Sequence, residues 1–347
     1  MTARLIYQSQ HSPQESLILV TGLAGVPGWN IFHGLRNLYP GRVVGQRPAD
    51  NPKANWEDTF AINSENEDLL RELFKKYSFA AVIDATGNCA LKACECAPHL
   101  SKILNQDFAV AIATECAKYD IPLLRISTDF VFSGDAGVGN YYEDDAMDPV
   151  TMYGKHMAWA EILITKRHPS TVFLRAPLPI GLSPGGKAGA IDWIEWRFRN
   201  GRPATLYYDE YRSVISMHDL VKVVDLWLRE PQRFAPGIYN CGGSRDVSLY
   251  QIGQIINAVG GYDPHLLHGC MRIEAGPMPP RTGHVGINCD KINSILPPGL
   301  IRPWPVEDYM YPGDDREWHH TVNRDKWKIN DSIGTFLMDG LYFLAKT

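Results

Sequence analysis

Three glycines mark the turn after the first apolar run of the chain. Gly22, Gly25 and Gly28 lie between residues 17–20, which have the composition of a buried strand, and residues 29–38, which have that of a helix. In this context the first glycine makes a tight turn, the second lets a pyrophosphate approach the backbone, and the third allows close helix–strand packing. The free N–H groups of the helix N-terminus also favour phosphate oxygens, so the pattern predicts a dinucleotide site. The expected cofactor contacts in this turn are Gly22, Leu23, Gly25 and Val26.

The end of the next apolar run indicates which dinucleotide fits. Arg47 follows that run, and its planar, permanently charged guanidinium suits the 2′-phosphate of NADP. The first acid that could bind the ribose hydroxyls of NAD is Asp50, beyond Pro48. The sequence therefore favours NADP. NAD stays open, with Arg47 stacked on adenine or solvated and Asp50 on the ribose.

The elements that must position this site alternate along the chain. Short runs rich in β-branched residues are separated by stretches of helical period, which is the pattern of repeated βαβ units. Right-handed crossovers then give an α/β fold with a doubly wound parallel sheet of the Rossmann type, and ligands bind at the carboxyl ends of its strands. We expect strands at 17–20, 42–44, 79–85, 122–127 and 171–175, and helices at 67–77 and 104–119.

The regular alternation breaks after Pro177 into loops rich in glycine and proline. We expect a dinucleotide-binding Rossmann domain over residues 1–178, to which residues 214–242 return. Residues 179–213 and 243–296 then form a second, smaller lobe that covers the substrate. The C-terminal extension, 297–347, is rich in aromatic residues and is interpreted as a lid, an oligomer contact or a surface arm.

Composition excludes several classes of protein. The 347 residues carry 34 Lys and Arg against 39 Asp and Glu, a formal net charge of −5, so nucleic acid is not an expected partner. No apolar stretch has the length of a bilayer span or an export signal, which predicts a cytoplasmic protein without membrane contact. Cys94 and Cys96 lack the CxxC spacing and have no second pair, so we expect no metal site. A homodimer is a candidate assembly because dimers are common in this fold.

Further motifs carry a family resemblance. The run from Ser127 to Gly134 reads STDFVFSG, and Tyr153-Gly154 opens a predicted helix that includes Glu161. Together with the glycine turn, these motifs resemble the extended short-chain dehydrogenase/reductases, and within them the dTDP-4-dehydrorhamnose reductase branch, which uses STDYVFDG and a YGxxK helix. The resemblance covers about residues 16–296.

The resemblance implies an NADP-dependent enzyme that reduces a keto group of a nucleotide-linked sugar. Thr128 would polarise the substrate carbonyl and Tyr153 would donate the proton. Asp129 would orient a substrate hydroxyl or cap a loop, and Trp193 and Arg281 would contact the sugar nucleotide, although Arg281 is equally interpreted as solvated. The further cofactor contacts implied are Ala85, Thr86, Gly87, Asn105, Ser127, Tyr153 and Pro177.

The sequence departs from the family at the position of its lysine. Met157 stands four residues after Tyr153, where the family lysine lowers the tyrosine pKa and holds the cofactor ribose, and Phe130 replaces a family tyrosine. Lys155 or His156 could reach back only if the helix start were distorted. Three hypotheses follow: a slower reductase supported by another cation, a non-catalytic NADP-binding regulatory subunit similar to that of methionine adenosyltransferase, or a sugar-nucleotide epimerase or dehydratase. In the first case, Met157→Lys is predicted to raise reductase activity.

Overall fold

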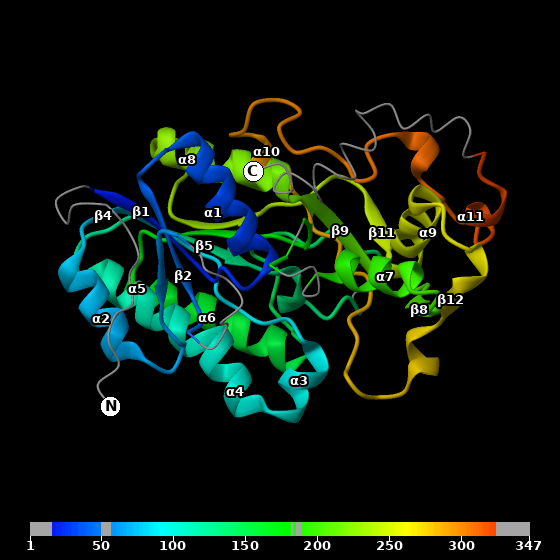
Figure 1. Cartoon of the computed structure of the whole chain (residues 1–347), viewed down its shortest axis with the longest axis horizontal. Coiled ribbons are helices and arrows are strands. Elements are labelled where there is room, and N and C mark those ends of the chain that lie inside the picture. The colour runs from blue at the N-terminus through cyan, green and yellow to red at the C-terminus, as the bar shows by residue number, and fades with distance from the viewer. Residues whose placement is uncertain (1–15, 50–56, 136, 182, 185–188, 324–347) are drawn as a thin grey trace.

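The computed structural model describes residues 16–49, 57–135, 137–181, 183–184 and 189–323. Its largest element is a parallel seven-stranded sheet in the order β10-β6-β5-β4-β1-β2-β3 (Figure 1). The chain builds one half outward from β1, crosses back, and builds the other half from β4, so the predicted doubly wound sheet is confirmed. The switch point between β1 and β4 is where such sheets bind ligands. The strands are β1 (Leu17–Thr21), β2 (Val43–Arg47), β3 (Thr59–Ala61), β4 (Phe79–Asp84), β5 (Leu123–Ser127), β6 (Val172–Arg175) and β10 (Gly237–Asn240).

Helices cover both faces of this sheet (Figure 1). In β1, Ile18 and Val20 belong to the apolar cluster shared with α1 and α8, whereas Leu17 and Leu19 belong to the cluster shared with α2 and α5. A strand that is buried on both sides needs an unbroken apolar run, which explains why β1 was readable from the sequence. The helices are α1 (Val26–Leu38), α2 (Glu67–Lys76), α3 (Leu91–Cys96), α4 (Pro98–Lys102), α5 (Phe108–Lys118), α6 (Met152–Arg167) and α8 (Met217–Arg229).

The helix predicted over residues 104–119 is different in the structure. Helix α4 leads into a π-helical turn, Ile103–Asp107, which is followed by α5. The turn carries Asn105, whose side chain is fully buried. Its Oδ1 accepts the backbone N–H of Asn88 at 2.6 Å, so the irregular turn places an amide against the loop after β4.

The smaller lobe has two minor sheets and its own apolar core. One sheet has the order β11-β9-β7 and the other pairs β12 with β8. Ile194, Ile255 and Leu267 lie in this core together with Trp304, which is 1% exposed. The described part of the C-terminal extension therefore packs into the lobe, and residues 324–347 lie outside the described part of the chain. The elements are β7 (Leu178–Ile180), α7 (Ala190–Arg199), β8 (Ala204–Tyr207), β9 (Tyr211–Ser216), β11 (Asp246–Ser248), α9 (Leu249–Gly260), β12 (Leu267–Cys270), α10 (Asp290–Asn293) and α11 (Trp318–Thr321).

Two kinds of feature are absent from the described residues. No helix among them combines the length and the apolar content that a bilayer crossing requires. In the same part of the chain, no three His, Cys, Asp or Glu side chains gather as metal ligands would.

A buried histidine lies at the contact between α11 and α9. His319 is 1% exposed, its Nδ1 lies 3.2 Å from Nε2 of Gln254, and burial followed by the charge of His320 lowers its pKa to about 4. The unfolded chain takes up this proton near pH 6.5, so between pH 6.5 and 4 the unfolded state binds more protons than the folded state. We expect the free energy of unfolding to fall as pH falls through this window, by about 1–3 kcal/mol from this group.

Denaturant unfolding at pH 7.5 and pH 4.5 measures this effect. His319→Gln should flatten the pH dependence relative to the unsubstituted protein. His33, whose pKa burial and then Arg36 also lower to about 4, acts in the same window and leaves a residual slope. His99→Gln, at an exposed position, is the control and should leave the profile unchanged. An identical slope in the His319→Gln variant would contradict the assignment.

Candidate functional site

A cavity of about 420 Å³ lies at the carboxyl ends of the central strands. One end is formed by the glycine turn after β1, and the other by residues that follow β5 and by α6. The smaller lobe closes it through Leu178, Pro179 and Arg212. It thus occupies the switch point of the sheet, where a doubly wound fold binds its ligand. The expected site residues that line it are Gly22, Gly25, Val26, Ala85, Thr86, Gly87, Ser127, Thr128 and Tyr153.

Only glycine fits the tight positions of the turn. Gly22 has φ +74°, and a Cβ there would lie 2.3 Å from the carbonyl oxygen of Ala85. A Cβ on Gly28 would lie 2.3 Å from the carbonyl oxygen of Gly22. By contrast, a Cβ on Gly25, the N-cap of α1, would make only ordinary contacts, 3.6 Å from the carbonyl oxygen of Gly22 and 3.9 Å from Cδ of Pro27, and Gly25 lines the cavity. The N-terminus of α1 is therefore open toward the cavity, as a pyrophosphate requires.

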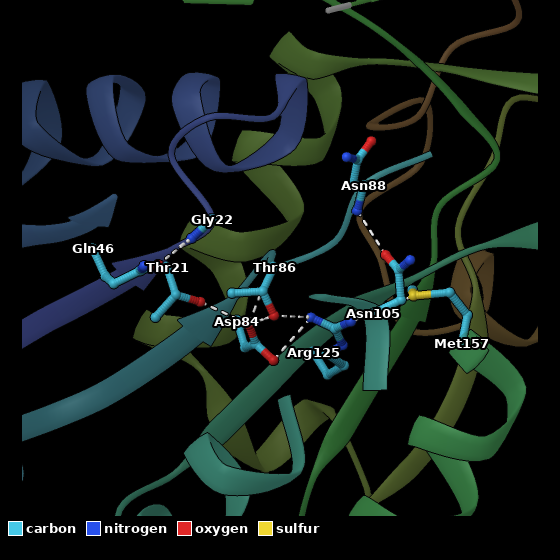
Figure 2. A network of polar contacts seen from close by, with 9 residues as sticks. All are labelled: Thr21, Gly22, Gln46, Asp84, Thr86, Asn88, Asn105, Arg125 and Met157. Carbon is cyan, nitrogen blue, oxygen red and sulfur yellow. Dashed lines mark hydrogen bonds and ion pairs between the residues drawn. The ribbon is translucent and has the colours of Figure 1, made fainter. Parts of the chain in front are cut away.

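Gln46, which the sequence analysis did not select, holds this turn in place. Its Oε1 accepts the N–H of Gly22 at 3.0 Å (Figure 2). Its Nε2 donates to the carbonyl of Ile62 at 2.6 Å. Gln46 also lines the cavity. The amide thus connects β2 to the glycine turn at the wall of the cavity.

Arg47 lies at the end of β2, as predicted, but its guanidinium is engaged within the protein. Its Nε donates to Thr59 Oγ1 at 3.3 Å and its Nη1 to the carbonyl of Pro48 at 3.1 Å. Asp50, the alternative ribose ligand, lies outside the described residues. The choice of NADP over NAD therefore stays a prediction.

Three expected cofactor contacts lie behind the cavity wall rather than in it. Leu23 is fully buried beside Gly45, Asn105 holds the N–H of Asn88, and Pro177 lies against Gly242. Their positions support the residues that do line the cavity. Their direct contact with a cofactor stays a prediction.

Thr128 and Tyr153 meet at the end of the cavity opposite the glycines. Thr128 Oγ1 accepts the N–H of Phe130 at 3.2 Å, which caps the 3-10 turn Asp129–Val131. Tyr153 stands in the first turn of α6 and lines the cavity together with Thr128, whose hydroxyl donates to Asp129 Oδ1 at 3.2 Å. The ring of Tyr153 contacts that of Phe130 edge-on, with the ring centres 5.6 Å apart. Burial raises the pKa of the Tyr153 phenol well above its ordinary value, although the nearby hydroxyl of Thr128 and the charge of Arg125 oppose this rise. The phenol is therefore protonated at neutral pH.

Met157 occupies the place that its spacing predicts. It lies one helical turn after Tyr153, lines the same cavity, and accepts an N–H from Arg125 Nη2 at an Sδ distance of 3.5 Å. Lys155 is exposed, and the ring of His156 is bonded to Ser101 Oγ at 2.9 Å. Helix α6 is regular from Met152, so neither of these two side chains reaches back to Tyr153.

Asp129 forms an ion pair that was not predicted from the sequence. The carboxylate is fully buried, and both of its oxygens are bound by Nε and Nη2 of Arg212. Arg212 lies on β9, lines the cavity, and places its guanidinium 4.2 Å from the centre of the Phe130 ring. Of the two roles predicted for Asp129, substrate orientation and capping, neither is its main contact here. A charged residue within the buried run of β9 was the available signal for Arg212.

The two other expected substrate residues lie on the smaller lobe, outside the lining of this cavity. Trp193 is 42% exposed with Arg197 5.2 Å from its ring centre, and Arg281 lies 4.8 Å from the ring centre of Tyr207. Their contact with a substrate stays a prediction.

Comparisons with known proteins agree with this geometry. The family model described as the RmlD substrate binding domain matches residues 16–297. The probable low-salt glycan biosynthesis reductase Agl14 of Haloferax volcanii is 24% identical over 193 residues, which cover 55% of this chain and 63% of that protein. The chain thus spans less than two thirds of that relative's length. Methionine adenosyltransferase 2 subunit beta of Xenopus laevis is 23% identical over 274 residues, 75% of this chain and 79% of that protein.

Among solved structures, dTDP-4-dehydrorhamnose reductase of Bacillus anthracis, in complex with NADP, superposes with a TM-score of 0.68. The alignment covers 82% of this chain and 94% of that one, at 16% identity. A likeness at this identity establishes the fold, and the chemistry has to be argued from the residues of the cavity.

Proposed function

The chain belongs to the RmlD substrate binding domain family of extended short-chain dehydrogenase/reductases, and on this basis we propose that it reduces a keto group of a nucleotide-linked sugar with NADPH. The observation that carries the proposal is that Thr128 and Tyr153, which each carry a hydroxyl, line one end of a cavity whose other end is an open glycine turn. A dinucleotide could thus bind along the cavity from the glycine turn, with Tyr153 as the proton donor at the opposite end.

In this proposal, the residues at the two ends of the cavity have different roles. Gly22 and Gly25 leave room for a pyrophosphate at the N-terminus of α1. A bound NADPH supplies the hydride. Thr128 donates a hydrogen bond to the substrate carbonyl, and Tyr153 gives its proton to the oxygen as charge develops there. Burial raises the pKa of Tyr153 and so keeps the phenol protonated, which is the form that donates a proton to a developing alkoxide. The phenolate that would remove a proton from an alcohol is correspondingly scarce.

One observation favours a second function, that of an NADP-binding regulatory subunit. The sulfur of Met157 offers no positive charge at the position next to Tyr153 on the helix face, and the pKa of Tyr153 is raised rather than lowered. Such a protein would bind the dinucleotide without turnover. The similarity to methionine adenosyltransferase 2 subunit beta supports the same hypothesis.

Cofactor binding and turnover distinguish the two functions. We expect the purified protein to quench and shift NADPH fluorescence on binding, more strongly than with NADH, and to oxidise NADPH with one of a panel of 4-keto sugar nucleotides. Binding without oxidation across the panel supports the regulatory function. Absence of NADPH and NADH binding contradicts both.

A pair of glycine variants locates the binding. Gly22→Ala should weaken NADPH binding about tenfold or more, because the added methyl group collides with the backbone of Ala85. Gly201→Ala is the matched control: its φ of +61° is equally unfavourable for alanine, but nothing lies within 4 Å. Equal affinities of the two variants would place the dinucleotide elsewhere.

A further inference from the structure

A fully buried carboxylate ties three structural elements together beneath the cavity. Asp84, the last residue of β4, accepts a hydrogen bond from Thr21 Oγ1 at 2.7 Å on its Oδ1. The same oxygen accepts the backbone N–H and the hydroxyl of Thr86, at 3.0 and 2.7 Å. Its Oδ2 accepts Nη1 of Arg125, on β5, at 2.9 Å (Figure 2). The ends of β1, β4 and β5 are therefore held by one charge.

The partner of this carboxylate is directed at the cavity wall. Arg125 is 1% exposed, and its Nη1 is shared between Asp84 and Thr86 Oγ1, the latter at 3.0 Å. Its Nη2 points to Sδ of Met157, as Figure 2 shows. A thioether is a weak acceptor and leaves the guanidinium charge uncompensated on that side. The pair is thus a fixed dipole whose positive end faces Met157 and whose negative end faces Thr21.

The side chain of Met157 lies between the Arg125 guanidinium and the cavity. It lines the cavity on the same helix face as Tyr153, one turn further along α6. A Cβ built on Gly87, which also lines the cavity, would lie 3.9 Å from the same sulfur. The positive end of the dipole is therefore one side chain away from the end of the cavity where Tyr153 stands.

We propose that Arg125 is a positioning residue that supplies the fixed positive charge at the Tyr153 end of the cavity, and that position 157 is neutral because this charge already stands behind it. The inference rests on the proposed function, because it concerns the nicotinamide end of a bound NADP(H). An oxidised nicotinamide is a cation and a reduced one is neutral. A buried positive charge near that end therefore disfavours NADP⁺ relative to NADPH.

The ratio of the dissociation constants of NADP⁺ and NADPH measures this directly and needs no turnover. In Arg125→Met we expect the ratio Kd(NADP⁺)/Kd(NADPH) to fall by about threefold or more. Because this variant leaves Asp84 buried without its ion-pair partner, the double variant Asp84→Asn/Arg125→Met is measured beside it and should shift the ratio in the same direction. A purely structural role of Arg125 would weaken both cofactor forms equally and leave the ratio unchanged, which would overturn the proposal.

A second ion pair provides the matched control. Asp219 is 1% exposed and is bound by Arg302 through Nη2 at 2.8 Å and Nε at 3.1 Å, outside the lining of the cavity. Asp219→Asn/Arg302→Met also removes a carboxylate–guanidinium pair, and should leave the ratio as in the unsubstituted protein. A shift of the same size in this control would show that loss of stability, rather than the charge of Arg125, moves the ratio.

Met157 gives an independent test with the sign reversed. Because the Arg125 guanidinium lies against position 157, Met157→Lys brings two cations together in a buried site. We therefore expect this variant to have a lower melting temperature, an effect that the sequence alone does not suggest. The double variant Met157→Lys/Arg125→Met should recover both the melting temperature and the unsubstituted Kd ratio. Met157→Leu, which keeps the Arg125 charge, should retain that ratio. Equal stability of Met157→Lys and Met157→Leu would contradict the proposal.

These outcomes separate this inference from the proposed function. If the protein binds neither NADP⁺ nor NADPH, the proposed function and this inference fail together. If it binds both and Arg125→Met leaves the ratio Kd(NADP⁺)/Kd(NADPH) unchanged, only this inference fails. If the protein binds both cofactor forms without turnover, the Kd ratio still tests the role of Arg125.

Discussion

Replacing Tyr153 by phenylalanine is expected to lower kcat of the proposed reduction by about 10²- to 10⁴-fold, the usual contribution of a positioned proton donor. The ring and its edge-on contact with Phe130, at 5.6 Å, remain in the variant, and only the hydroxyl is lost. NADPH affinity should therefore stay close to that of the unsubstituted protein. Steady-state oxidation of NADPH at saturating substrate measures kcat, and fluorescence titration measures the affinity.

A second buried tyrosine is the control for this substitution. Tyr239 is 4% exposed and its hydroxyl donates to the carbonyl of Ala235 at 3.0 Å, away from the cavity. Tyr239→Phe should keep nearly full activity with a small loss of stability. If Tyr153→Phe retained more than about a tenth of the activity, another group would have to donate the proton.

The raised pKa of Tyr153 also fixes the shape of the pH profile. A phenol whose pKa lies above the ordinary value of 10.0 stays protonated at neutral and mildly alkaline pH. We therefore expect kcat for reduction to be flat between about pH 7 and pH 9, because no loss of the donor proton occurs there. A decline of kcat with rising pH in that range, absent in Tyr153→Phe, would show that the bound cofactor lowers the pKa of this phenol.

Replacing Arg212 by methionine is expected to cost about 3–5 kcal/mol of unfolding free energy, since it leaves a fully buried carboxylate unpaired. Asp129 is 0% exposed and receives two hydrogen bonds from Arg212. Methionine keeps apolar contact with the Phe130 ring, so the lost charge dominates the effect. Because Arg212 lies on β9 of the smaller lobe and Asp129 follows β5 of the large sheet, the variant should also loosen the wall of the cavity and weaken NADPH binding.

Denaturant unfolding with two reference variants checks this prediction. Asp129→Asn/Arg212→Met removes both charges and should lose less stability than Arg212→Met alone. Arg71→Met removes an exposed guanidinium that contacts Glu67 and Asp68, and should cost only about 0–1 kcal/mol. A loss in Arg212→Met no larger than that in Arg71→Met would show that Asp129 is solvated or protonated when its partner is absent.

The large sheet could be predicted because its signals are local. The predicted strand 79–85 corresponds to Phe79–Asp84, and the predicted helix 67–77 to Glu67–Lys76, since a chain buried in alternating layers shows its period within a few residues. Strand β3 was missed because Thr59–Ala61 has only three residues and depends on its pairing with β2. The π-helical turn at Ile103–Asp107 was missed for a related reason: it is selected by the contact of Asn105 with Asn88, not by helical period.

In the candidate site, too, some residues were predicted from the sequence and others were not. The glycine turn, Thr128 and Tyr153 were recognisable because a strand end, a turn and the first turn of a helix each carry a short motif. Arg212 and Arg125 were not recognised. Arg212 pairs with Asp129 across 83 residues of sequence, and Arg125 contacts Met157 across 32, so no spacing rule relates them.

The sequence by itself determined the fold family, the glycine turn after the first strand and the fact that position 157 lacks a charge, because each is a property of neighbouring residues in the chain. Only the tertiary structure decided what that neutral residue means. It placed the Arg125 guanidinium behind the sulfur of Met157 and closed the Arg212–Asp129 pair across the two lobes. The energy of a charge depends on the groups that surround it after burial, and those groups come together only when distant strands pack.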